Sequence, residues 1–170
     1  MTWEPRLNIQ PVTRFRENLI YFMQQHIDDC LIWAADQCGL STVPPSPEGF
    51  FNSMAVRPKR PIVNVLAGGA DPEDDEDGNR LEVKRLVIEI ERTAGDSDQL
   101  ITVLEPYTLA FTSMVLEMTD DDWFRNIGND DRGDLDVTVG RERYSGRTYE
   151  TEKTFLQVGS VEVTLIYTQT

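Results

Sequence analysis

Histidine and cysteine are scarce in this sequence, which holds one histidine and two cysteines among 170 residues. Asp29 and Cys30 follow His26 by three and four residues, but these residues match no recognised metal motif. The Cys-x-x-Cys, His-Glu-x-x-His and Gly-x-Ser-x-Gly motifs and the phosphate-binding loop are also missing. Triad hydrolysis needs a base beside the nucleophile, and His26 is the only histidine. We therefore expect no catalytic, metal or cofactor site, and a protein that binds other proteins rather than an enzyme.

Basic residues are also few, with 16 lysines and arginines against 30 aspartates and glutamates. The formal net charge is -14 and the isoelectric point is near 4.4. Nucleic-acid affinity depends on lysine and arginine neutralising phosphates, and a field of this sign repels DNA and anionic lipid. The charge therefore disfavours DNA binding, although it suits a surface that must stay near DNA without adhering to it.

Long apolar runs are missing too, because no window approaches the eighteen apolar residues that a membrane helix needs. The first residues lack the basic and apolar regions of a signal peptide, so we expect neither secretion nor a membrane. Cys30 and Cys38 are eight residues apart in one expected helix, which separates their Cα atoms by about 12 Å. A disulfide spans at most about 7 Å, so we expect free thiols in a reducing compartment.

The clearest element is a helix from Pro11 to Cys38, whose apolar residues recur at spacings of three and four. Gly39 closes it as the residue after the C-cap, and Pro44 and Pro45 prevent any continuation. We interpret residues 40–51 as an irregular connection. The apolar stripe consists of Phe15, Leu19, Phe22, Met23, Ile27, Cys30, Leu31 and Ala34.

Two β-rich runs follow, Pro61–Ala67 and Leu81–Arg92, and an acidic loop near 68–80 joins them. Asp98 is a candidate N-cap for a second helix that begins after Gly95. Pro106 falls within this helix, so either the helix kinks there or Pro106 opens a fresh first turn.

The chain closes with a strand from Leu135 to Tyr144 and another from Phe155 to Tyr167, connected around Ser145 and Gly146. The order is helix, two strands, helix, two strands. It predicts an α+β fold: a mainly antiparallel four-stranded sheet with two helices packed on one face. We expect a single domain over residues 1–170.

The first acidic loop contains Asp74, Asp75, Glu76 and Asp77, which suit a partner interface. A calcium-binding EF-hand loop is the alternative, because acids occupy several of its ligand positions. Its twelfth position is Lys84, however, where a bidentate glutamate is required. We favour a solvated or partner-facing loop.

A second aspartate-rich loop, near 119–134, carries Trp123 and Phe124, and the proline-rich connection carries Phe50 and Phe51. Loops with such aromatic residues often become ordered against a neighbouring molecule. Both an interface role and packing onto their own domain are open for these four residues.

The order of the elements resembles that of the tail terminator, or tail completion, proteins of long-tailed phages such as phage lambda. The resemblance covers residues from about Phe15 to the end of the chain and is one of layout. Its segments are the helix Phe15–Cys38, the strand Ile62–Val65, the strand Leu86–Ile90, the helix after Asp96–Asp98 and the strand Val161–Tyr167.

The resemblance implies a virion protein that assembles in the host cytoplasm into a homohexameric ring. The ring would cap the tail tube protein and join it to the head–tail connector, while genomic DNA passes through without specific binding. Asp74, Asp75, Glu76 and Asp77 would then line the ring lumen or an interface. Alternatives of the same class are another neck or connector protein and a tail tube relative. An acidic DNA-mimic inhibitor is the alternative from a different class.

Overall fold

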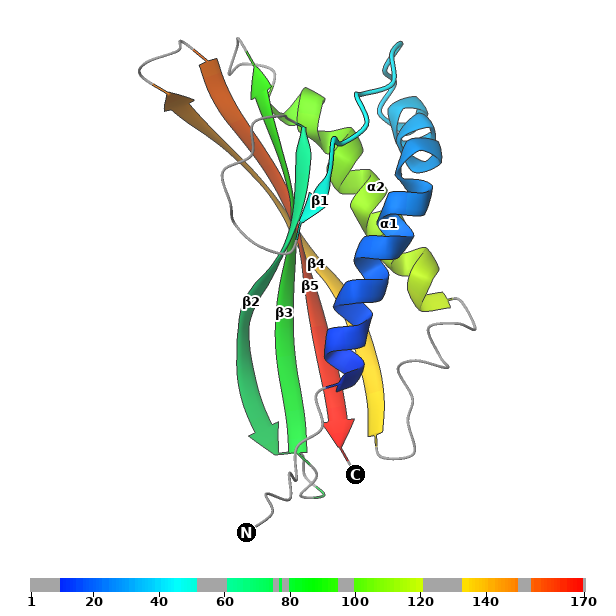
Figure 1. Ribbon diagram of the computed structural model, residues 1–170, viewed down its shortest axis with the longest axis vertical. Coiled ribbons are helices and arrows are strands. Elements are labelled where there is room, and N and C mark those ends of the chain that lie inside the picture. Colours follow the sequence, from blue (N-terminus) through cyan, green and yellow to red (C-terminus); the bar gives the residue numbers. More distant parts are fainter. Residues whose placement is uncertain are drawn as a thin grey trace.

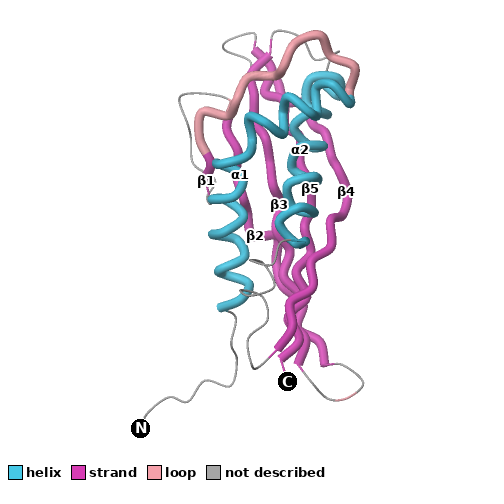
Figure 2. Tube along the Cα trace, turned by 90° about the vertical axis from the view of Figure 1, so that its right-hand side faces the viewer, coloured by secondary structure: helices cyan, strands magenta, loops and turns pink. Residues whose placement is uncertain are grey.

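The computed structural model describes residues 10–51, 61–74, 77, 80–94, 100–120, 133–149 and 154–169. They form a five-stranded sheet in the order β1-β2-β3-β5-β4, with two helices packed side by side on one of its faces (Figures 1 and 2). The elements are α1 (Gln10–Gln37), β1 (Phe50–Phe51), β2 (Ile62–Asp74), β3 (Arg80–Ala94), α2 (Leu100–Asp120), β4 (Gly133–Tyr149) and β5 (Thr154–Gln169). The α+β class and the helix order are as expected.

Helix α1 buries one stripe of its surface. Six of the predicted side chains recur every three or four residues and are at most 3% exposed, namely Phe15, Leu19, Met23, Ile27, Leu31 and Ala34, so the spacing places them on a single face toward the core. The other two predicted members, Phe22 and Cys30, are only partly buried. Gly39 follows with a φ of 68°, a left-handed conformation that glycine adopts without steric cost. The backbone N–H groups of Leu40 and Gly39 donate to the carbonyl oxygens of Ala35 and Asp36 at 2.9 and 3.0 Å. This is the Schellman pattern, which ends the helix at the predicted glycine.

The core lies between the helices and the facing side of the sheet. Alternate residues of β3 and β5 point into it, as expected for strands with one buried face. Fully buried examples are Ile88 and Ile90 of β3, Val163 and Tyr167 of β5, and Phe111 of α2. This layer of apolar side chains is the main source of stability that the structure shows.

The sheet differs from the predicted one in having a fifth, parallel strand. Phe50 and Phe51 form β1, which pairs with β2 at Val63 and Asn64. Backbone bonds flank this pairing, from Glu48 N–H to the Pro61 carbonyl oxygen at 2.7 Å and from Val63 N–H to that of Gly49 at 2.9 Å. The prediction of an irregular connection over 40–51 was wrong at its end, because a two-residue strand is too short to produce a pattern.

The acidic segment near 68–80 is mostly strand rather than loop. Strand β2 continues to Asp74 and pairs with β3 down to Asp74 opposite Arg80, with an irregularity between Ala67 and Gly69. Proline at position 72 is tolerated because this part of β2 lies at the sheet edge beyond β1. Glu73 pairs with Leu81, so the supposed twelve-residue calcium loop is a hairpin instead.

Helix α2 runs unbroken from Leu100 to Asp120 with Pro106 inside it, so no new helix begins at this proline. Strand β4 continues past its predicted end, and Ser145 and Gly146 pair with Val158 and Gln157. The turn predicted at Ser145 and Gly146 was therefore wrong. A glycine between polar residues resembles a turn in sequence, but long-range pairing with β5 overrides that local preference.

Gly159 allows α2 to lie close to β5. A Cβ atom at this position would lie 3.2 Å from Leu104 Cβ and 3.3 Å from Ile90 Cγ2 and Thr108 Cγ2. We predict that Gly159→Val lowers the free energy of unfolding by about 1–3 kcal/mol through overpacking, measured by urea denaturation. At Gly140 the added atom would meet only ordinary contacts of 3.4 Å or more. Equal losses for Gly140→Val and Gly159→Val would contradict this explanation.

Candidate interaction surfaces

The acids predicted to form a lumen or interface loop are distributed over two kinds of structure. Asp74 is the last residue of β2, and Asp77 is exposed in the turn that follows. Asp75 and Glu76 lie outside the described residues. Their proposed contact with a neighbour stays a prediction.

The four predicted interface aromatics are also separated. Phe50 and Phe51 lie half-buried in β1, and Phe50 packs against the core. Trp123 and Phe124 lie outside the described residues. At least Phe50 therefore contributes to its own domain.

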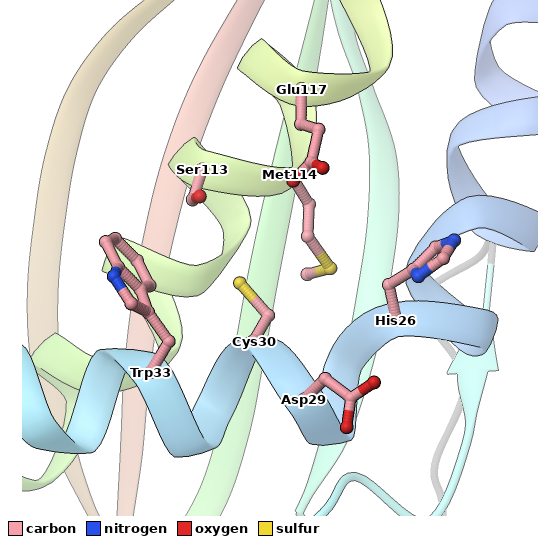
Figure 3. Close-up of a pocket in the computed structure, with 7 residues that line it drawn as sticks. All are labelled: His26, Asp29, Cys30, Trp33, Ser113, Met114 and Glu117. Atoms are coloured by element: carbon pink, nitrogen blue, oxygen red, sulfur yellow. The ribbon is translucent and has the colours of Figure 1, made fainter. Parts of the chain in front are cut away.

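A groove that sequence reasoning did not identify lies between α1 and α2 and encloses about 340 Å³ (Figure 3). Cys30 and Trp33 extend from α1 toward α2, where Ser113 and Met114 face them. The Cys30 thiol donates a weak hydrogen bond to the Ala110 carbonyl oxygen, with an S···O distance of 3.5 Å. The lining residues are His26, Asp29, Cys30, Trp33, Ser113, Met114 and Glu117.

The groove has an apolar floor and an acidic rim. Met114 is 1% exposed at the floor, Trp33 is 42% exposed, and both Asp29 and Glu117 are exposed. Ile32 and Leu116, at 57% and 54% exposure, are further apolar side chains on the same two helices. Trp33 and Ile32 fall outside the core stripe of α1, and this departure was the available sequence signal for the surface.

The groove offers no activated nucleophile. Burial raises the pKa of the Cys30 thiol, the Glu117 carboxylate raises it further, and a hydrogen bond with Ser113 opposes both effects. The thiol is therefore protonated at neutral pH, and only a thiolate is a strong nucleophile. His26 is exposed and lies against Phe22, with 4.4 Å between the ring centroids. Among the described residues, no group of three or more histidine, cysteine or acidic side chains is placed to hold a metal.

A cluster of hydrogen-bonded polar side chains joins α2 to β4. The Tyr144 hydroxyl lies 2.9 Å from Thr108 Oγ1 and donates to Glu142 Oε2 at 2.8 Å. Burial raises the pKa of Tyr144 to about 12, so its hydroxyl stays protonated at neutral pH. Tyr107 donates to the Pro45 carbonyl oxygen at 2.6 Å and attaches the proline-rich connection to α2. Both tyrosines therefore have structural roles.

The β4 edge of the sheet is basic at its middle. Arg141 and Arg143 are exposed there on either side of the exposed Glu142, which leaves one net positive charge, at an irregularity in the pairing with β5 between Val139 and Glu142. Strand β4 is the last strand in the sheet order. The groove is lined by residues of α1 and α2 and by none of β4.

Comparison with known proteins places this chain in no family. No family model and no curated protein matches it. One solved structure, described as the virion of a native gene transfer agent particle, is similar over 81% of this chain and 84% of that chain. The identity is 14% and the TM-score is 0.32, too low for any functional argument. Neither described helix is long and apolar enough to cross a membrane.

Proposed function

We propose that this protein is a virion structural component, specifically a tail terminator whose ring caps the tail tube and joins it to the head-side connector. The observation that carries the proposal is the layout of the domain. The elements follow the order that resembles the tail terminator proteins: a long first helix, the β2–β3 hairpin, α2 and the β4–β5 hairpin. The hairpins share one sheet, and both helices cover the same face of it (Figure 1).

Ring formation is compatible with the asymmetry of the sheet. One edge carries β1 and the acidic end of β2, whereas the other is the basic middle of β4. Unlike surfaces of this kind permit head-to-tail contacts, which generate a closed ring when the rotation between copies closes. A net charge of -14 also suits passage of DNA through the ring, because like charge lowers adhesion.

The proposed role is one of binding, without catalysis and without a cofactor. Its partners would be further copies of the chain, the tail tube protein and the head–tail connector. The DNA-mimic alternative requires acids regularly spaced along one face. Here exposed acids occur on several elements of the described structure: on α1 at Glu17, Asp28, Asp29 and Asp36, on α2 at Glu105 and Glu117, and on β4 at Asp136 and Glu142. Because these acids are not confined to one face, they favour the ring over the DNA mimic.

Negative-stain electron microscopy and light scattering of the purified protein, alone and mixed with tail tubes, test the proposal. We expect rings of about six subunits with a central hole, in solution or at the tube end. A monomer at every concentration that also leaves tube length and tube ends unchanged would refute the ring. Binding of this monomer to a DNA-binding protein would then favour the inhibitor.

A further inference from the structure

We propose that the groove between α1 and α2 receives the β4 edge of a second copy of this chain, with Arg141 and Arg143 facing Asp29 and Glu117. The inference rests on the proposed self-assembly and specifies which surfaces carry it. It also accounts for how a chain of net charge -14 associates with itself.

The groove has the features of a protein-binding site. Trp33 combines a large apolar surface with an indole N–H, and tryptophan is enriched among residues that dominate binding energy. It is 42% exposed beside the buried Met114, so a partner side chain entering the groove would cover apolar surface. Asp29 and Glu117 are exposed acidic residues of the groove lining and favour a cationic partner.

The β4 edge supplies that cationic partner within the same chain. Of the lysines and arginines whose side chains the structure describes, Arg14, Arg141 and Arg143 are the exposed ones. Arg141 and Arg143 are both exposed on this edge strand, Arg141 within the irregularity between Val139 and Glu142 and Arg143 just after it. Arginine is also the cation best suited to paired contacts with carboxylates at interfaces.

The two surfaces form a contact that propagates. Groove and edge are different patches, so a copy that offers its edge to one neighbour still presents its groove to another. Such a heterologous contact produces a ring or a filament rather than an isolated dimer. Without this local pairing, two strongly acidic copies would repel each other.

Charge reversal on each side tests the contact. The groove variant is Asp29→Arg with Glu117→Arg, and the edge variant is Arg141→Glu with Arg143→Glu. Each variant alone places like charges together, so we expect self-association to weaken roughly tenfold or more. Mixed in equal amounts, the variants present opposite charges at both kinds of junction. Light scattering and electron microscopy should then show rings of alternating variants.

Glu17→Arg with Asp28→Arg is the matched control, since it makes the same charge change at exposed positions of α1 outside the groove. It should assemble like the wild type. Thermal unfolding verifies that every variant is folded. As a second readout, alkylation of Cys30 should slow on assembly because its groove is covered. The two cysteines are separated by mass spectrometry.

The outcomes separate the two proposals. If both single variants form rings as readily as the wild type, the proposed contact is wrong. It is also wrong if the two folded variants do not assemble with each other when mixed. Neither result contradicts the terminator role. If rings form only on tail tubes, the same variants are tested for capping of the tubes. Each single variant should then cap poorly, and the mixture should cap like the wild type. A wild type that assembles neither in solution nor on tubes would overturn both proposals.

Discussion

Phe111→Ala is expected to lower the free energy of unfolding by about 3–5 kcal/mol. Phe111 is 0% exposed in the middle of α2, within the cluster that joins both helices to the sheet. Removing its ring loses the burial of an aromatic side chain and leaves a cavity that the packed core refills only partly. Because small domains are stable by only about 5–15 kcal/mol, the loss is a large fraction of the total. Urea denaturation at fixed protein concentration measures it.

Leu116→Ala on the same helix is the control, since Leu116 is 54% exposed. We expect this variant to stay within about 0.5 kcal/mol of the wild type. Similar losses for both variants would show that burial in the core does not determine the cost.

Raising the pH above about 10 is expected to remove roughly 2–3 kcal/mol of stability through Tyr107 alone. Burial raises the pKa of Tyr107 to about 12, although Arg92 opposes the shift, whereas an exposed tyrosine titrates near 10. Between these values the unfolded chain loses the proton and the folded chain keeps it. The stabilisation is therefore fully present below pH 10 and disappears as the pH rises toward 12.

Tyr107→Phe isolates this contribution from the other groups that titrate in alkali. At pH 7 the variant should be less stable by about 1–2 kcal/mol, because the Pro45 carbonyl oxygen loses its 2.6 Å hydrogen bond. Urea unfolding from pH 7 to 11 should show the wild type losing more stability than the variant, so that their difference shrinks. If the stability of the wild type and of the variant falls equally with pH, burial does not raise the pKa of Tyr107.

Local signals predicted the strongest elements of this fold correctly. The apolar stripe from Phe15 to Ala34 and the glycine at position 39 were sufficient to predict α1 and its end. Periodicity and the left-handed C-cap are properties of residues close in sequence. Both hairpins and the second helix were also recognised. The ends of β2 and β4 were missed because Pro72 and Gly146 favour turns locally, while pairing with β3 and β5 holds them extended.

The candidate interaction site was less predictable. Arg141 and Arg143 sit two residues apart in sequence, but only the sheet order shows that their strand is an edge. Trp33 and Glu117 line one groove from two helices that are separated in sequence by three strands. No spacing rule relates such residues.

The sequence by itself determined the α+β class, the core stripe of the first helix, the acidic charge and the scarcity of residues for common catalytic and metal motifs. These properties depend on composition and on neighbours three or four positions apart. Tertiary structure decided the fifth strand, the extension of β2 and β4, and the groove beside Trp33. Each of these depends on hydrogen bonds or packing between distant segments, whose stabilisation exists only once the chain has folded.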